Sequence, residues 1–91
     1  MWRIGRTDTF SRTARRYLRR RPHLHAPFTR TLELLEENPA HPKLRLHALD
    51  AKLRGLHAVS VTYQVRLVVE IDETEQTLIL VDLGDHDDVY R

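Results

Sequence analysis

The sequence predicts an α+β fold in two layers, in the order β-α-α-β-β-β, with an N-terminal helical hairpin packed on an antiparallel sheet. Three observations predict this fold. Apolar residues recur at helical spacing in the N-terminal part, they alternate with polar residues after Gly55, and short polar turns separate the alternating runs. A chain of 91 residues has room for one modest core, so we expect residues 1–91 to form a single domain.

The first helix is expected to follow a short strand at residues 2–6. Thr7 and Asp8 both favour the position before a helix, because their side-chain oxygens accept hydrogen bonds from unpaired backbone N–H groups. The helix should therefore begin near Asp8. Pro22 should end it, since proline cannot donate a helical hydrogen bond. Its apolar residues follow helical spacing: Phe10, Ala14, Tyr17 and Leu18.

A second helix is expected after residues 23–25, with Pro27 tolerated in its first turn. Its apolar stripe contains Phe28, Leu32 and Leu35. Asn38-Pro39 should end it, and the short connection between the two helices predicts an antiparallel hairpin. Residues 39–55 show no regular spacing, and we expect a partly extended segment that faces solvent.

Three strands in meander order are expected after Gly55. Alternation predicts them around Val59 and Val61, from 65 to 71, and from 78 to 81. Adjacent strands joined by short turns pair antiparallel. In the middle strand, Arg66 alternates away from the apolar residues, so it should point to the sheet face that the helices leave open to solvent or ligand.

Charge is distributed unevenly along the chain. Residues 1–30 carry nine arginines against one acid, a net +8, whereas residues 31–91 carry six basic residues against twelve acids, a net −6. A basic half indicates a polyanionic partner, either a nucleic acid or an acidic protein segment. The outer face of the first helix is especially rich in arginine: Arg12, Arg15, Arg16, Arg19 and Arg20.

The composition also excludes several kinds of site. Cysteine is absent, which removes disulfides, thiol nucleophiles and cysteine-based metal sites. Residues 23–25 and 85–88 contain metal-ligand types without the spacing of a known zinc or calcium loop, so we expect no metal and no other cofactor. No stretch approaches the roughly 20 apolar residues that cross a bilayer, and the first residues lack a signal peptide's hydrophobic region. We expect a cytoplasmic protein without a membrane partner.

The C-terminal half carries four short motifs in a fixed order: Leu46-His47-Ala48-Leu49, Lys52-Leu53-Arg54-Gly55, Val65-Arg66-Leu67-Val68 and Asp82-Leu83-Gly84-Asp85-His86-Asp87-Asp88-Val89-Tyr90. Together with the element order, they resemble the RelE/ParE toxin superfamily, and in particular its YafQ-like branch. The resemblance implies the toxin of a type II toxin–antitoxin system, an endoribonuclease that cleaves messenger RNA on the ribosome. It also implies neutralisation by a cognate antitoxin protein that wraps the toxin.

Position by position, the resemblance implies a catalytic site and neighbouring phosphate contacts. RelE has an additional arginine where this chain has Val61-Thr62, and an arginine-rich run near the position of His86. The site implied here is therefore based on histidine. Its catalytic residues would be His47, Arg66, His86 and Tyr90, and its RNA-binding residues Lys52 and Arg54.

These residue types suit metal-independent cleavage by a 2′-hydroxyl group. The reaction needs a base for the 2′-OH proton, an acid for the leaving 5′-oxygen, and cations for the phosphate. Histidine suits both proton transfers because its ordinary pKa lies near neutral pH, so His47 and His86 form the expected pair, in either order. Arginine binds phosphate in bidentate fashion and lysine adds a point charge. Tyr90 is suited to stacking on a base or to assisting proton transfer.

Other interpretations remain open from the sequence. Arg66 would alternatively form a solvated ion pair with Glu70, and Tyr90 would alternatively pack as an anchor for the tail. At the level of function, ParE-type toxins share the fold but inhibit DNA gyrase by binding, without an acid–base pair. A degenerate toxin would keep antitoxin binding alone. The pair His47 and His86 favours the ribonuclease.

Overall fold

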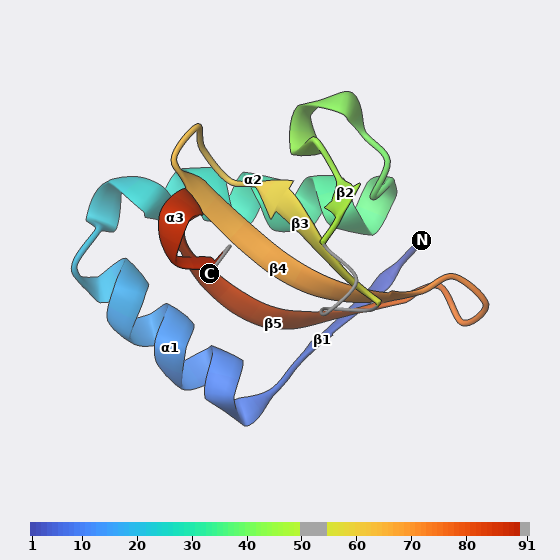
Figure 1. The fold of residues 1–91 in the computed structure, drawn as a ribbon, viewed down its shortest axis with the longest axis horizontal. Helices are drawn as coiled ribbons and strands as arrows, with labels where there is room; N and C mark the ends of the chain where they lie inside the picture. Colours follow the sequence, from blue (N-terminus) through green and yellow to red (C-terminus); the bar gives the residue numbers. More distant parts are fainter. Residues whose placement is uncertain (50–54, 90–91) are drawn as a thin grey trace.

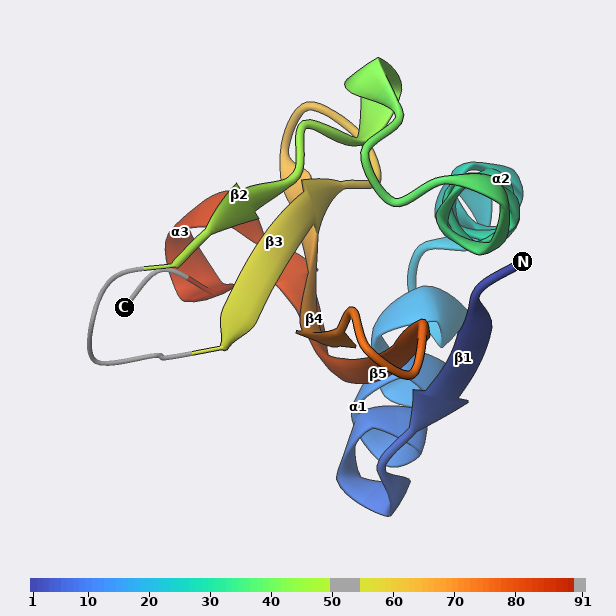
Figure 2. The ribbon, with the colours of Figure 1, turned by 90° about the vertical axis from the view of Figure 1, so that its right-hand side faces the viewer.

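Two helices cover one face of a five-stranded sheet in the computed structural model, which describes residues 1–49 and 55–89 (Figures 1 and 2). A short third helix lies on the opposite side of the sheet. The elements are β1 (Arg3–Arg6), α1 (Asp8–Arg19), η1 (Pro22–Leu24), α2 (His25–Glu37), η2 (Pro42–Leu44), β2 (His47–Ala48), β3 (Leu56–Ser60), β4 (Val65–Asp72), β5 (Thr77–Asp85) and α3 (His86–Val89).

Both predicted helices are confirmed, together with the signals that delimit them. Thr7 caps α1 by accepting a hydrogen bond from the backbone N–H of Phe10, at 2.9 Å. Asn38 caps the end of α2, and Pro27 occupies its first turn. The chain reverses at η1, so that α1 and α2 form an open hairpin (Figure 1). None of the helices in the described part of the chain is long and apolar enough to cross a membrane.

The sheet has the strand order β1-β5-β4-β3-β2. The predicted antiparallel meander is confirmed for β3, β4 and β5. The expectation of a wholly antiparallel sheet is corrected at one edge, because β1 pairs parallel to β5, with Arg3 opposite Thr77 and Arg6 opposite Leu80. After β1 the chain forms the two helices and then the strands of the meander. The last of these strands, β5, lies beside β1, so the first and last strands of the chain are neighbours in the sheet.

The last strand is longer than its alternation indicates, because β5 contains a bulge. Between Val68 and Val69 of β4 the register slips, so that Val68 faces Asp82 and Val69 faces Leu80. The residue left over, Val81, allows Leu80 and Leu83 to point to the same face although they are an odd number of residues apart. Both are buried in the core, at 2% and 3% exposure.

The core lies between the helices and the sheet. Its fully buried side chains are Phe10, Leu35, Leu44, Val59, Leu67, Val69, Leu78 and Leu80. Leu44 belongs to the segment that we expected to face solvent, and it corrects that expectation: η2 turns this side chain inward, where it closes one end of the core. Removing an apolar side chain of this size from water stabilises the fold by about 2 kcal/mol.

The opposite face of the sheet is only partly open. Ala58 and Val68 point to this face and yet are buried, at 0% and 4% exposure. The short helix α3 packs here against β4 and β5, on the side of the sheet away from α1 and α2 (Figure 2). Solvent therefore reaches this face beside α3, and that is where the candidate site lies.

Candidate functional site

Arg66 stands on the face of the sheet away from the helices, as its alternation in β4 predicts. It lies opposite Ser60 of β3 and Gly84 of β5. Its Nη1 donates hydrogen bonds to the backbone carbonyl oxygens of Thr62 and Tyr63, each at 2.8 Å. The turn between β3 and β4 thus fixes one end of the guanidinium.

The expected alternative for Arg66, an ion pair with Glu70, is absent among the described residues. The guanidinium turns toward the strand end, away from Glu70, because the carbonyls of the turn offer it hydrogen bonds in a fixed geometry. Its positive charge is therefore not neutralised by an acid of its own strand, which suits it to binding an anion.

His86 is the first residue of α3 and follows directly after β5. Its backbone N–H donates to the carbonyl oxygen of Gln64 at 2.7 Å, which ties the start of α3 to the same turn that holds Arg66. The His86 side chain is half exposed, at 51%, and its Nδ1 lies 3.4 Å from Oδ1 of Asp87. One turn therefore positions both an imidazole and a guanidinium.

A hollow of about 510 Å³ lies between these two side chains, and we call it the site hollow. Its wall combines two guanidinium groups, two carboxylates, an imidazole, a phenol and an amide. Such a mixture suits a ligand that carries both an anionic group and hydroxyl groups. The described lining residues are Arg45, Tyr63, Gln64, Arg66, Asp85, His86 and Asp87.

His47 lies on the edge strand β2, outside the lining of the site hollow. It pairs with Ala58, so its side chain is on the same face of the sheet as that of Arg66. Its Nδ1 lies 3.0 Å from the carbonyl oxygen of Arg45, a residue whose own side chain does reach the hollow. Lys52, Arg54 and Tyr90 lie outside the described residues.

Several lining residues were not anticipated from the sequence. Arg45 comes to the hollow because its backbone adopts the left-handed conformation, with φ 52°, at the end of η2. Tyr63 lies in the tight turn, and the signal that marks it is an aromatic residue between two strands. Asp85 contacts the helical layer, because the hydroxyl of Tyr17 in α1 donates a hydrogen bond to its carboxylate.

Tyr17 is itself covered by a cation. The guanidinium carbon of Arg21 lies 3.8 Å from the centre of the Tyr17 ring, within the range of a cation–π contact. Arg21, Tyr17 and Asp85 therefore connect the basic helix to the end of β5, next to His86. Among the described residues, no group of three histidine or acidic side chains is arranged to hold a metal ion.

Comparison with known proteins identifies the fold. No family model matches the sequence, and no curated protein sequence matches it significantly. Solved structures do match. YafQ from E. coli has 16% identity and a TM-score of 0.80 over 100% of both chains. A metal-bound toxin from Helicobacter pylori has 26% identity and a TM-score of 0.74, over 98% of this chain and 99% of the other.

Two further matches extend the comparison. A YoeB/ParE toxin from Agrobacterium tumefaciens has 13% identity and a TM-score of 0.77, over 92% of this chain and 98% of its own. YafQ in the E. coli DinJ-YafQ toxin–antitoxin complex has 17% identity and a TM-score of 0.79 over 100% of both chains. The chain thus has a RelE/YafQ-like toxin fold from end to end, which confirms the fold and the resemblance expected from the sequence.

Proposed function

We propose that this chain is the toxin of a type II toxin–antitoxin pair and that it cleaves messenger RNA on the ribosome, without a metal ion or other cofactor. The observation that carries the proposal is the site hollow, where one turn holds the half-exposed His86 beside Arg66. The fold, which is similar to toxins over their full lengths, supports it.

The scissile phosphate binds in the site hollow against Arg66. A guanidinium carries five N–H donors, and Nη1 supplies the two that the turn accepts. Nε and Nη2 then donate to the non-bridging phosphate oxygens, where charge increases in the transition state. Because the turn fixes Nη1, the guanidinium is oriented before the substrate arrives, and less side-chain entropy is lost on binding.

His47 and His86 act as the base and the acid of the cleavage. The base removes the proton from the 2′-OH, O2′ attacks phosphorus, and the bond from phosphorus to O5′ breaks. The acid gives a proton to O5′, so that the products are a 2′,3′-cyclic phosphate and a free 5′-hydroxyl. The carboxylate of Asp87, 3.4 Å from Nδ1 of His86, favours a proton on that nitrogen.

The remaining parts of the proposal follow from the family resemblance. Lys52 and Arg54 bind phosphates next to the cleaved one, and Tyr90 stacks on a base or assists proton transfer. A cognate antitoxin protein neutralises the toxin, as the E. coli toxin–antitoxin complex of the same fold suggests. The reaction takes place on ribosomes in the cytoplasm.

Primer-extension mapping of cellular transcripts tests the proposal. Brief induction of the wild-type protein should produce cuts inside translated reading frames. The double variant His47→Ala, His86→Ala should produce none, while a control double variant, His23→Ala, His25→Ala, should cut like the wild type. The control histidines are exposed and lie at the junction of η1 and α2. Wild-type induction without cuts would refute the ribonuclease.

Gyrase inhibition is the second candidate function, and the structural match to a YoeB/ParE toxin is the observation that favours it. In that case induction would arrest growth with intact transcripts and with stalled complexes of gyrase and DNA. Growth without arrest would instead assign the chain to antitoxin binding alone.

A further inference from the structure

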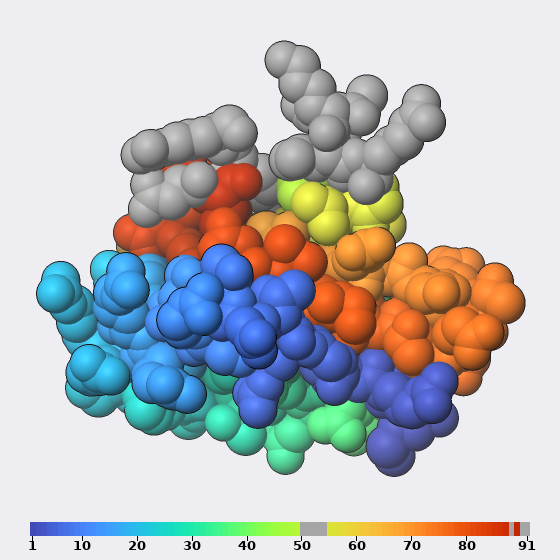
Figure 3. Space-filling model, turned by 90° about the horizontal axis from the view of Figure 1, so that it is seen from below, coloured from blue at the N-terminus to red at the C-terminus, as the bar shows by residue number. Residues whose placement is uncertain are grey.

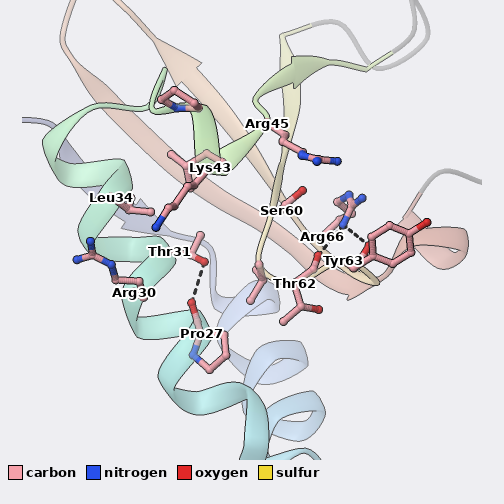
Figure 4. Close-up of a pocket in the computed structure, with 13 residues that line it drawn as sticks. Pro27, Arg30, Thr31, Leu34, Lys43, Arg45, Ser60, Thr62, Tyr63 and Arg66 are labelled. Atoms are coloured by element: carbon pink, nitrogen blue, oxygen red, sulfur yellow. Dashed lines mark hydrogen bonds between the residues drawn. The ribbon is translucent and has the colours of Figure 1, made fainter.

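We propose that a second hollow beside the site hollow binds the single-stranded RNA that flanks the cleaved phosphate. This inference rests on the proposed ribonuclease function and adds a substrate-binding surface to it. The second hollow, here called the flanking groove, has a volume of about 710 Å³ and lies between α2, η2 and the turn from β3 to β4 (Figure 4).

The charge of the flanking groove is the first argument. Its described lining contains four cationic side chains, Arg30, Lys43, Arg45 and Arg66, and no carboxylate. The site hollow, in contrast, combines its two arginines with two acids. A groove that is cationic on both walls attracts the phosphates of a nucleic acid, and it releases counterions when they bind.

Arg30 forms a surface ion pair with Glu33, but this pair does not neutralise its charge fully. Nη1 of Arg30 lies 3.7 Å from Oε1 of Glu33, and the two side chains are 61% and 57% exposed. An exposed pair of this kind contributes little free energy. A phosphate in the groove can therefore compete for Arg30.

The second argument is continuity with the site hollow. Arg45, Tyr63 and Arg66 line both hollows. Figure 4 shows these three side chains on one side of the groove and Arg30 and Lys43 on the other. An RNA strand whose cleaved phosphate lies at Arg66 therefore continues into the flanking groove, with its next phosphates near Arg45 and Lys43.

The third argument is the exposure of Tyr63. Its side chain is 85% exposed, although a large aromatic group is usually at least partly buried. It lies where the two hollows meet, in a turn that already uses its backbone to hold Arg66. An exposed ring beside phosphate-binding cations is the arrangement with which proteins stack single-stranded bases. This feature favours RNA over an acidic peptide as the occupant.

Fluorescence anisotropy with a labelled single-stranded RNA tests the groove, with 2′-O-methyl sugars to prevent cleavage. The test variant is Arg30→Gln, Lys43→Gln, which leaves the site hollow intact. The matched control is Arg15→Gln, Arg19→Gln, which removes the same charge from two exposed positions of α1. Figure 3 shows the outer surface of this helix in blue. We expect the test variant to weaken binding about tenfold and to reduce the salt dependence, the slope of log Kd against log salt, by about 1.4. The control should keep the wild-type slope.

Tyr63 provides an independent readout. Tyr63→Ala should weaken RNA binding about tenfold, whereas Tyr63→Phe should bind like the wild type, because the ring and not the hydroxyl stacks on a base. An equal loss in both variants would contradict the stacking role. Because the side chain is exposed, neither substitution should change the melting temperature.

Several outcomes would overturn the groove. The first is a loss of RNA affinity in the α1 control that equals or exceeds the loss in the test variant. The second is the absence of RNA binding by the wild-type protein at low salt. The third is a glutamate-rich peptide that displaces RNA from the wild-type protein and that the test variant no longer binds. The results also separate this inference from the proposed function. If the wild-type protein cuts transcripts and the test variant binds RNA as well as the wild type, the groove alone is refuted. If the test variant loses RNA binding as expected and the wild-type protein cuts no transcripts, the ribonuclease alone is refuted.

Discussion

The hydroxyl of Tyr17 in α1 donates a hydrogen bond to the carboxylate of Asp85, 68 residues later in the chain and next to His86. This contact connects the helical layer to the end of β5, where the site hollow begins. The Tyr17 ring is in turn covered by the guanidinium of Arg21. The basic helix therefore helps to hold the candidate site although none of its residues lines the hollow.

Tyr17→Phe removes this hydrogen bond while it keeps the ring under Arg21. We expect the free energy of unfolding to fall by about 1 kcal/mol, because the contact is exposed and its acceptor is charged. Urea denaturation measures the change. A double-mutant cycle with Asp85→Asn should give a coupling energy of similar size. A coupling near zero would show that the contact does not stabilise the protein in solution.

His86→Ala should abolish growth arrest and leave the melting temperature unchanged. The side chain is half exposed, so its loss creates no cavity, whereas the proposed reaction loses its acid or base. Growth curves after induction and thermal unfolding of the purified protein give the two readouts. His23→Ala is the matched control on an exposed position. Toxicity that survives in His86→Ala would remove this residue from the mechanism.

Arg66→Lys should abolish arrest almost as fully as Arg66→Gln. Lysine keeps the charge, but it cannot hold the turn carbonyls with one nitrogen and the phosphate with the others. The measurement is growth arrest at matched protein levels, with urea denaturation to compare the two variants. Full activity in Arg66→Lys would mean that charge alone is needed and that the fixed guanidinium has no role.

Leu35→Ala tests the core between the layers. Leu35 is completely buried in α2, and its truncation should cost about 2–5 kcal/mol of unfolding free energy. For a domain of this size the melting temperature should fall by about 10 °C or more. Leu32→Ala is the matched control, because this residue of the same helix is only partly buried. Equal losses in the two variants would contradict the observed burial.

The sequence predicts local structure well because its signals are local. Thr7 marks the start of α1, Asn38 marks the end of α2, and the alternation around Arg66 places its side chain on the correct face. Each of these signals depends on residues within one turn of helix or a few positions of a strand. The resemblance to toxins added the order of motifs, and the structural matches confirm the fold that it implied.

Features that depend on distant residues could not be predicted in this way. A four-residue strand such as β1 carries no information about its partner, so its parallel pairing with β5 was missed. The full length of β5 could not be predicted, because the bulge at Val81 breaks the alternation of apolar and polar residues. Of the candidate site, Arg66 and His86 come together, while the approach of Arg45 depends on a left-handed backbone at the end of η2.

The parallel pairing of β1 with β5 sets the order in which the sheet can be completed. During synthesis β1 is made well before β5, because Arg3 pairs with Thr77, 74 residues later in the chain. At about 5–20 residues per second, the first strand waits on the order of seconds to tens of seconds for its neighbour. Until then β1 has no neighbouring strand in the sheet. The turn between β3 and β4 also lacks the hydrogen bond that the backbone N–H of His86 donates to Gln64. Under the proposed function, the site hollow is complete only when β5 has joined the sheet, because Asp85, His86 and Asp87 lie at the end of that strand or directly after it.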